Sequence, residues 1–370
     1  MSMILDGSNG VTFNDSSLQG AAASPYVLKN RIINGAMVID QRNAGASVTP
    51  TNGQYIVDRW QAWANQASKF TVQQNAGSVT PPAGFINYLG VTSSSAYSVA
   101  AGDYFFLEQP IEGLNVTDLN WGTASAQTVT LSFWVRSSLT GTFAGSLRNS
   151  ASNRSYVFSY TISSANTWEQ KSVTIAGDTS GTWLTTSGIG IQLQFSLGAG
   201  STYSGTAGSW SANNYVSATG ATSVVGTNGA TFYITGVQLE IGTSATPFER
   251  RLYNQELANC QRYCLKYCGN TLYEDVNVNL IGFNGTTAYG TIFTVVPMRS
   301  SPSVTSGTLR LVDQTNVISV SSIVASGSSY SGPYNINVGA NVASGVIQYR
   351  PYQLQANNST SAYLILSAEL

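Results

Sequence analysis

Alternation of apolar and polar residues over strand-length stretches is the feature that most constrains the fold of this 370-residue chain. In Ile189–Leu197 apolar residues occupy every second position, and Gly, Gln and Ser occupy the positions between them. Successive side chains of a β-strand point to opposite faces, so this pattern predicts a strand with one face in a core. Val276–Leu280 and Tyr334–Val338 alternate in the same way. Five Asn-Gly pairs supply the residues that tight hairpin turns require, which indicates antiparallel pairing.

The predicted fold class is therefore all-β, because the strands are joined by short turns without helix-length crossovers between them. We expect an antiparallel jelly-roll or β-sandwich domain, then a short helix, then a second, smaller C-terminal β-sandwich domain. The predicted boundaries are an N-terminal arm at 1–30, the jelly roll at 31–250, a helical junction at 251–269 and the C-terminal domain at 270–370.

The one predicted helix follows Asn254, which can cap it, and ends at Gly269. Leu257, Cys260 and Cys264 fall on one stripe of this helix. Three thiolates spread over eight helical residues span about 12 Å, too far to share one metal ion, so we interpret the cysteines as reduced, buried small hydrophobes. The stripe either packs on its own domain or lines a threefold axis, which makes Leu257, Cys260 and Cys264 candidates for an oligomer interface.

Composition excludes several classes of function. A net charge of −1 leaves no basic field for nucleic acid, and no stretch approaches the length of a membrane span, so we expect neither nucleic-acid binding nor membrane insertion. The absence of histidine removes Ser-His-Asp and Cys-His catalysis and every histidine-containing metal site. Only 9% of residues are charged, and a polar, uncharged surface suits self-association or hydrogen bonding to sugars. The chain is predicted to be a binding protein and not an enzyme.

Several motifs resemble those of a family of phage and prophage tail-fibre proteins. Five of them bracket one whole domain, about residues 30–265, and are Asn30–Arg42, Tyr55–Trp60, Tyr233–Gly242, Ala245–Arg251 and Glu256–Tyr263. The ending Ser367–Leu370 also resembles the C-terminal ends of such fibres. The resemblance implies a jelly roll similar to carbohydrate-binding modules, a homotrimer in the tail of a virion assembled in the host cytoplasm, and binding to a host cell-surface glycan. It also implies that residues 1–30 attach to other tail proteins, and that the C-terminal domain is a candidate receptor-binding tip.

Trp134 and Arg136 are the first candidates for glycan contact. In Leu131–Arg136 the apolar set faces inward, which turns Trp134 and Arg136 to the other face, and Gln192 and Gln194 are predicted to extend that polar face. The alternative is that a second sheet or a neighbouring subunit covers this face. Trp60 and Trp63, beside Asp58 and Arg59, are interpreted as structural, whereas five aromatic residues in loop-like surroundings remain unranked: Trp168, Trp183, Tyr203, Trp210 and Tyr215.

Carboxylates form one dense cluster, at Asp103, Glu108 and Glu112. Hydrolysis of a sugar chain requires two carboxylates across a cleft, and this cluster is the place where an enzyme would hold them. The preferred interpretation is that they are turn residues, or that Asp103 and Glu108 bind a structural Ca²⁺, the only cofactor considered. Two alternatives to receptor binding stay open: a purely structural fibre or collar component, and a glycan-degrading tailspike enzyme.

Overall fold

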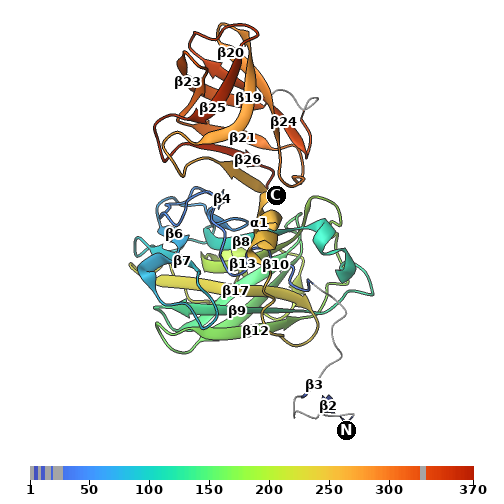
Figure 1. The fold of residues 1–370 in the computed structure, drawn as a ribbon. Helices are drawn as coiled ribbons and strands as arrows, with labels where there is room; N and C mark the ends of the chain where they lie inside the picture. The colour runs from blue at the N-terminus through green and yellow to red at the C-terminus, as the bar shows by residue number, and fades with distance from the viewer. Residues whose placement is uncertain (1–3, 7–9, 13–17, 20–27, 326–330) are drawn as a thin grey trace.

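The computed structural model describes residues 4–6, 10–12, 18–19, 28–325 and 331–370. Two β-rich units follow one another along the chain, one above the other in Figure 1, with a single α-helix between them. The predicted all-β class is confirmed. Most of the predicted arm at 1–30 lies outside the described residues; three short strands there pair as one sheet, β1 (Ile4–Asp6), β2 (Gly10–Thr12) and β3 (Leu18–Gln19).

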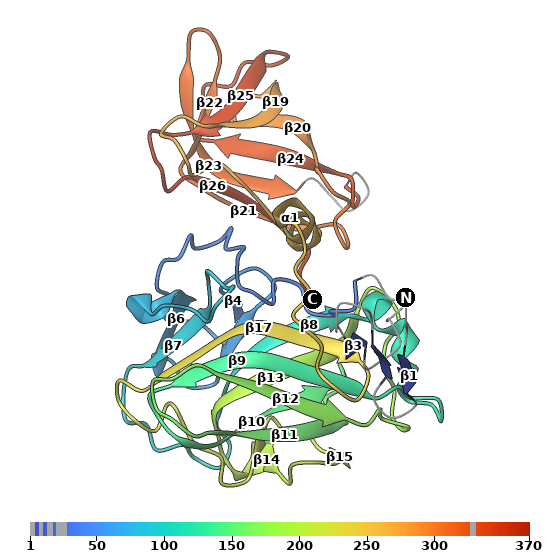
Figure 2. The same ribbon diagram turned by 60° about the horizontal axis from the view of Figure 1, so that its bottom comes forward.

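The first unit is a sandwich of two antiparallel sheets, seen from below in Figure 2. The seven-stranded sheet contains, in spatial order, β15 (Trp210–Ser211), β11 (Ser155–Ile162), β10 (Gly141–Arg148), β13 (Ile189–Ala199), β8 (Tyr104–Glu112), β5 (Gln61–Ala64) and β4 (Gln54–Tyr55). The five-stranded sheet contains β12 (Glu169–Ile175), β9 (Val129–Ser137), β17 (Thr231–Ile241), β7 (Leu89–Ser93) and β6 (Phe70–Gln74). A parallel pair of short strands, β14 (Ser204–Gly205) and β16 (Ser217–Ala218), belongs to neither sheet.

The core of this unit confirms the alternation predicted for β13. Leu193 and Phe195 are fully buried and face the other sheet, where the Phe133 ring lies 5.0 Å from that of Phe195 in an edge-to-face contact. Aromatic rings packed edge to face add to the free energy of burial, so the two sheets are held together along their centre. Four short 3-10 helices lie in the connections: η1 (Ala76–Ser78), η2 (Gly113–Asn115), η3 (Thr117–Leu119) and η4 (Ser201–Tyr203).

The second unit contains a closed sheet where the sequence suggested two facing sheets. Its six strands form a barrel in the order β19 (Asp275–Asn284), β20 (Thr287–Phe293), β24 (Asn335–Val342), β23 (Val317–Ala325), β22 (Leu309–Val312) and β25 (Pro351–Ala356). Closure pairs the first strand with the last, which leaves the sheet without free edges. A three-stranded sheet, β18 (Cys264–Tyr267), β26 (Tyr363–Ser367) and β21 (Ser303–Gly307), lies between the barrel and the sandwich (Figure 1).

The helix α1 (Tyr253–Gln261) is shorter than predicted, which corrects the proposed helical junction. Cys264 to Tyr267 form strand β18, whose backbone pairs with β26 from the end of the chain. The spacing of the cysteines is helical by arithmetic, but pairing with a distant strand decides the backbone at Cys264, and local spacing does not report it. Within the described residues, no helix is long and apolar enough to span a membrane.

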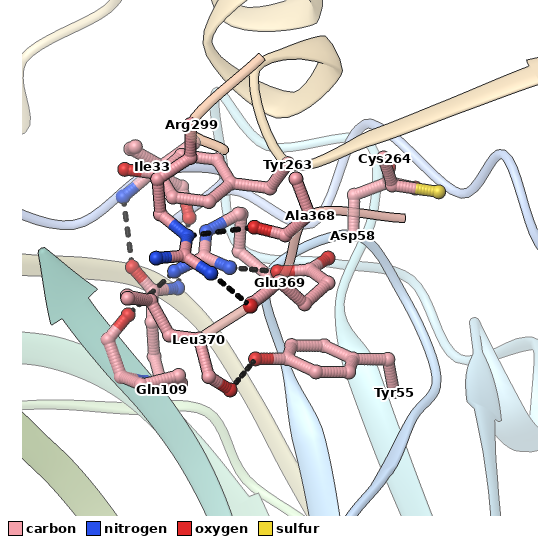
Figure 3. A network of polar contacts seen from close by, with 12 residues as sticks. Ile33, Tyr55, Asp58, Gln109, Tyr263, Cys264, Arg299, Ala368, Glu369 and Leu370 are labelled. Atoms are coloured by element: carbon pink, nitrogen blue, oxygen red, sulfur yellow. Dashed lines mark hydrogen bonds and ion pairs between the residues drawn. The ribbon is translucent and has the colours of Figure 1, made fainter. Parts of the chain in front are cut away.

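A polar network joins the two units around the end of the chain (Figure 3). Glu369 lies between two guanidinium groups of the first unit, forming ion pairs with Arg42, at 3.0 Å, and with Arg59. The exposed fractions of the Glu369 and Arg59 side chains are only 6% and 1%. Arg59 also stacks on the Tyr263 ring, 3.6 Å from its centroid, and donates to the carbonyl of Pro110 at 2.6 Å. Ser367 to Leu370 are thus held against the side of the sandwich that faces the barrel (Figure 1).

Arg299 closes the same network from the second unit. Its guanidinium donates to the carbonyl oxygens of Ala368, at 2.7 Å, and Glu369, at 2.7 Å, which fixes the backbone of the chain end. A third donor reaches the carbonyl of Ser187 in the first unit at 2.9 Å. One residue therefore holds both the chain end and the sandwich, as Figure 3 shows for the contacts with Ala368 and Glu369.

We expect Glu369→Gln to destabilise the whole chain. The substitution preserves size but leaves the buried guanidinium group of Arg59 without a carboxylate, while Arg42 keeps only Asp58 at 3.9 Å. Removing the partner of a buried charge typically lowers the free energy of unfolding by roughly 3–5 kcal/mol. Urea unfolding followed by fluorescence measures the change. Asp118→Asn is the matched control, since the Asp118 side chain is 36% exposed in its ion pair with Arg31 and should contribute at most about 1 kcal/mol. Equal effects of the two substitutions would contradict the importance assigned to Glu369.

Asp58, next to Arg59, makes stability depend on pH. Burial raises the pKa of Asp58 to about 6, against the opposing effect of Arg42, while its carboxylate accepts hydrogen bonds from the Gln41 main chain (2.7 Å) and side-chain amide (2.6 Å). A folded pKa above the unfolded value of about 3.9 means that the folded state binds the proton more tightly. Protonated Asp58 therefore contributes to the free energy of unfolding near pH 4, and this contribution is lost as the pH rises through 6.

From pH 7 to pH 5, we expect the unfolding free energy of the wild type to increase relative to that of Asp58→Asn by about 1 kcal/mol. The variant serves as the reference because other carboxylates titrate equally in both proteins. Urea unfolding of the two proteins at each pH gives the difference. A change in the opposite direction would show that Asp58 is ionised more readily in the folded state than in the unfolded chain.

Candidate functional site

The outer face of the seven-stranded sheet carries buried polar side chains that we call the polar floor: Glu108, Ser146, Arg148, Gln192 and Gln194. Strand register brings them together, because Glu108, Gln194 and Ser146 are opposite one another on β8, β13 and β10. Arg148 and Gln192 form the next row. Side chains opposite one another on adjacent strands lie close enough for direct contact, so one face of three strands becomes a continuous polar surface.

Hydrogen bonds connect every member of the polar floor. The amides of Gln192 and Gln194 donate to the two oxygens of Glu108, at 3.0 Å and 2.5 Å. Ser146 donates to Gln194 at 2.7 Å, and Arg148 donates to Gln192 at 3.1 Å. A fully connected network of this kind holds its members in fixed positions.

The charges of the polar floor are one carboxyl and one guanidinium. A guanidinium nitrogen of Arg148 lies 3.6 Å from an oxygen of Glu108. Burial raises the pKa of Glu108, although Arg148 acts against this, and burial lowers the pKa of Arg148. Because the pair is buried and mutually compensating, the polar floor presents oriented hydrogen-bonding groups and almost no net charge.

A pocket of about 150 Å³ opens beside the polar floor. Its lining combines aromatic rings with two polar side chains and a valine: Trp63, Tyr104, Phe106, Arg148, Tyr203, Asn214 and Val216. Trp63 stacks on Phe106 at 5.9 Å between ring centroids, and Tyr104 meets Tyr203 edge to face at 5.2 Å. Arg148 also donates a hydrogen bond to Asn214.

This pocket has the chemistry of a site for a sugar ring. Aromatic faces pack against the C–H face of a pyranose, while amide and guanidinium groups bind hydroxyls. Trp63 and Tyr203 are only partly buried, so their rings remain accessible. The polar side chains that fix the Arg148 guanidinium come from the sheet beneath and from the loop that carries Asn214.

Trp134 and Arg136 lie on the other sheet, so the predicted single face of Trp134, Arg136, Gln192 and Gln194 is wrong. Both residues belong to β9 of the five-stranded sheet, whereas the two glutamines belong to β13 of the seven-stranded sheet. Alternation within a strand assigns the face of each side chain, but it does not tell which sheet the strand joins.

Trp134 and Arg136 are partly buried, and Phe85 lies near Trp134 around Gly236. A Cβ placed on Gly236 would meet Phe85 at 2.6 Å and Trp134 at 3.2 Å, which shows how closely Phe85 approaches. Arg136 donates to the carbonyl of Asn166 at 3.0 Å and lies 5.5 Å from the Tyr233 ring centroid. Trp134 is thus partly covered by a segment of its own chain, which is neither the second sheet nor the neighbouring subunit of the alternative.

The geometry does not fit a calcium site shared by Asp103 and Glu108. Asp103 accepts hydrogen bonds from the Tyr97 hydroxyl and the Ala100 main chain, both at 2.8 Å. The carboxylate of Glu108 instead accepts hydrogen bonds from Gln192 and Gln194 in the polar floor. The described residues contain no cluster of three or more carboxylate or thiol groups suited to a metal ion.

Cys260 and Cys264 are fully buried within the chain, and Leu257 is partly buried. Burial raises the pKa of both thiols. Neither cysteine side chain faces outward, so neither is available to a neighbouring subunit, which corrects their assignment as interface candidates. The burial of both side chains fits their interpretation as buried small hydrophobes.

Sequence reasoning missed Trp63, Arg148, Tyr203 and Asn214 as site residues. A signal existed for Trp63: in Gln61–Ala64 the alanines point inward, which leaves the tryptophan on the outer face. Tyr203 was one of the unranked loop aromatics. For Arg148 and Asn214 the sequence carried no such signal, because a long-range register brings them together.

No protein-family model matches the sequence, and no curated protein does. Among solved structures, the enzymatically active domain of tailspike protein 4 from bacteriophage CBA120 is 16% identical with a TM-score of 0.32, covering 60% of this chain and 22% of that one. A putative sugar-binding protein from Bacteroides thetaiotaomicron is 14% identical with a TM-score of 0.35, covering 58% of this chain and 100% of that one. A family 61 carbohydrate-binding module in complex with β-1,4-galactotriose is 11% identical with a TM-score of 0.28, covering 52% and 100%. Likenesses this distant assign neither a ligand nor an activity.

Proposed function

We propose that the protein binds glycans through the pocket beside the polar floor and serves as a receptor-binding component of a phage tail fibre. The observation that carries the proposal is the group of aromatic rings around Arg148 and Asn214, above a rigid polar network. The compensated charge of Arg148 favours a neutral sugar. The pocket volume of about 150 Å³ favours one sugar unit over an extended chain.

The tail-fibre part of the proposal rests on the sequence motifs. They resemble tail-fibre motifs over one whole domain, and the ending Ser367–Leu370 resembles the ends of such fibres. In this proposal, residues 1–30 attach to other virion tail proteins and the chain forms a homotrimer. Several weak sites in one assembly then raise the overall affinity for a host cell surface without new contacts.

We infer that the protein is not an enzyme. Glu108 and Glu112 are four residues apart on β8, so their Cα atoms are separated by about 13 Å. Each carboxylate is paired with a different guanidinium group, that of Arg148 for Glu108 and that of Arg262 for Glu112, so the two do not face each other across an open cleft as glycosidase carboxylates do. Arg262 forms an ion pair with Glu112 at 2.7 Å, and Tyr263 donates to the same carboxylate at 2.5 Å. Glu112 is thus part of the contact between the two units, which argues against a catalytic role.

Substituting Trp63 tests the proposed function. Trp63→Ala removes a ring of the pocket and should weaken binding to a neutral glycan about tenfold or more, as expected for loss of an aromatic anchor. The full-length protein would be screened on a glycan array and against host cell envelopes, with affinities measured by calorimetry. Trp134→Ala is the matched control, a partly buried tryptophan of the opposite sheet, and should bind normally.

Loss of binding in Trp134→Ala but not in Trp63→Ala would overturn the assignment of the pocket. Failure of the wild type to bind any envelope or glycan would favour the purely structural alternative, a fibre or collar component. Release of reducing ends from host polysaccharide, abolished by Glu108→Gln or Glu112→Gln, would instead establish a glycan-degrading enzyme.

A further inference from the structure

The barrel of the second unit exposes apolar side chains next to an open groove. The groove has a volume of about 720 Å³ and runs over β19, β25 and the turn after β22. Ile281, 57% exposed, is paired in register with Pro351, and both belong to its apolar part together with Val312 and Tyr352. Tyr289, 42% exposed, is opposite Ile281 on β20 and extends this apolar surface.

A row of polar groups runs beside the apolar part. Asn279 and Gln353 are opposite one another on β19 and β25, and Gln314 lies in the turn after β22. Within the described residues, the side chains of Asn279 and Gln314 make no hydrogen bond to the protein. This distinguishes the groove from the polar floor of the first unit, where the side chains satisfy one another.

Arg350 is the one cation of the groove and is held in place. Its guanidinium contacts Asp313 at 3.0 Å and donates to the Thr315 hydroxyl at 3.0 Å. Main-chain N–H groups of Thr315 and Asn316 bind the same carboxylate at 2.7 Å, and these bonds lower the pKa of Asp313 to about 2. The carboxylate therefore stays ionised and cancels the charge of Arg350 over the whole physiological pH range.

Tyr349 stands beside the groove in a strained conformation. Its φ of 66° lies in the left-handed region, which is unfavourable for a bulky side chain, and its main chain is held by a hydrogen bond to Gly282 at 2.8 Å. The side chain is 80% exposed, so burial within the chain does not offset the strain. Strained residues of this kind cluster at sites of binding.

We propose that this groove is a second glycan-binding site, for a neutral, extended glycan chain, separate from the pocket of the first unit. Apolar side chains beside the amides of Asn279, Gln314 and Gln353 match the C–H face and the hydroxyls of a sugar chain, although the Gln353 oxygen also accepts from Gln355 at 3.3 Å. Adjacent strands place the amides about 4.8 Å apart, comparable with the length of one sugar unit. The compensated charge of Arg350 disfavours acidic glycans. This inference goes beyond the proposed function, which concerns only the first unit.

The test uses the full-length Trp63→Ala protein, in which the first site is disabled. Affinity electrophoresis in gels containing neutral polysaccharides, galactomannan and dextran, or the acidic polysaccharide alginate, should show retardation by at least one neutral polymer. Adding Asn279→Ala and Gln353→Ala should reduce this retardation about tenfold or more. Asn341→Ala, which removes an amide elsewhere on the same barrel, is the matched control and should leave it unchanged.

Complete loss of neutral-glycan binding in Trp63→Ala alone would overturn the second site and leave the proposed function intact. Binding that persists in the triple variant, or that is confined to alginate, would also overturn it. A decrease in molar mass by light scattering on adding Asn279→Ala and Gln353→Ala, with glycan binding unchanged, would show instead that copies of the chain meet at this groove.

Discussion

The ion pairs of Glu369 with Arg42 and Arg59 are the interaction on which the relative placement of the two units depends. Removing a guanidinium group from water is unfavourable, and Arg59 is almost fully buried. Only a carboxylate at this point compensates the charge, and the fold obtains it from the penultimate residue of the chain. The first unit is therefore complete only when the C-terminal strand has delivered Glu369. Folding of the second unit and stability of the first are coupled through this contact.

The motifs that resemble tail-fibre proteins acquire a physical explanation from this junction. Arg42, Arg59, Tyr263 and Glu369 come from four different motifs and contact one another at this junction, where Figure 3 shows Tyr263 and Glu369. Glu256 adds a further link, because its carboxylate accepts a hydrogen bond from the main chain of Asn34. Four of the six motifs thus fix the end of the chain to the sandwich, and none of the six forms the pocket.

Local pattern in the sequence predicts which side chains face the core but not where distant strands meet. Leu193 and Phe195 were correctly assigned to the interior by alternation alone. The helix was extended wrongly through Cys264 because its pairing with β26 depends on a segment about a hundred residues later in the chain. Gln192 was assigned to a polar face, which is correct, but to the same face as Trp134, which is not. Sheet membership and register arise from the packing of the whole domain.

The two proposed sites differ in whether their polar side chains are hydrogen-bonded to the protein. Because the junction connects the two units rigidly, this difference bears on how the chain would bind a surface. In the first unit the amides of Gln192 and Gln194 serve Glu108, so they position Arg148 and leave little freedom for adaptation to different ligands. On the barrel, Asn279 and Gln314 are free to adjust to what lies over them. A rigid connection between a selective pocket and a tolerant groove keeps the distance between them fixed. Two weak sites at a fixed distance favour a cell surface whose glycans can fill both sites at once. Once the first site is filled, the effective glycan concentration at the second site is highest when the spacing of the glycans equals the distance between the sites.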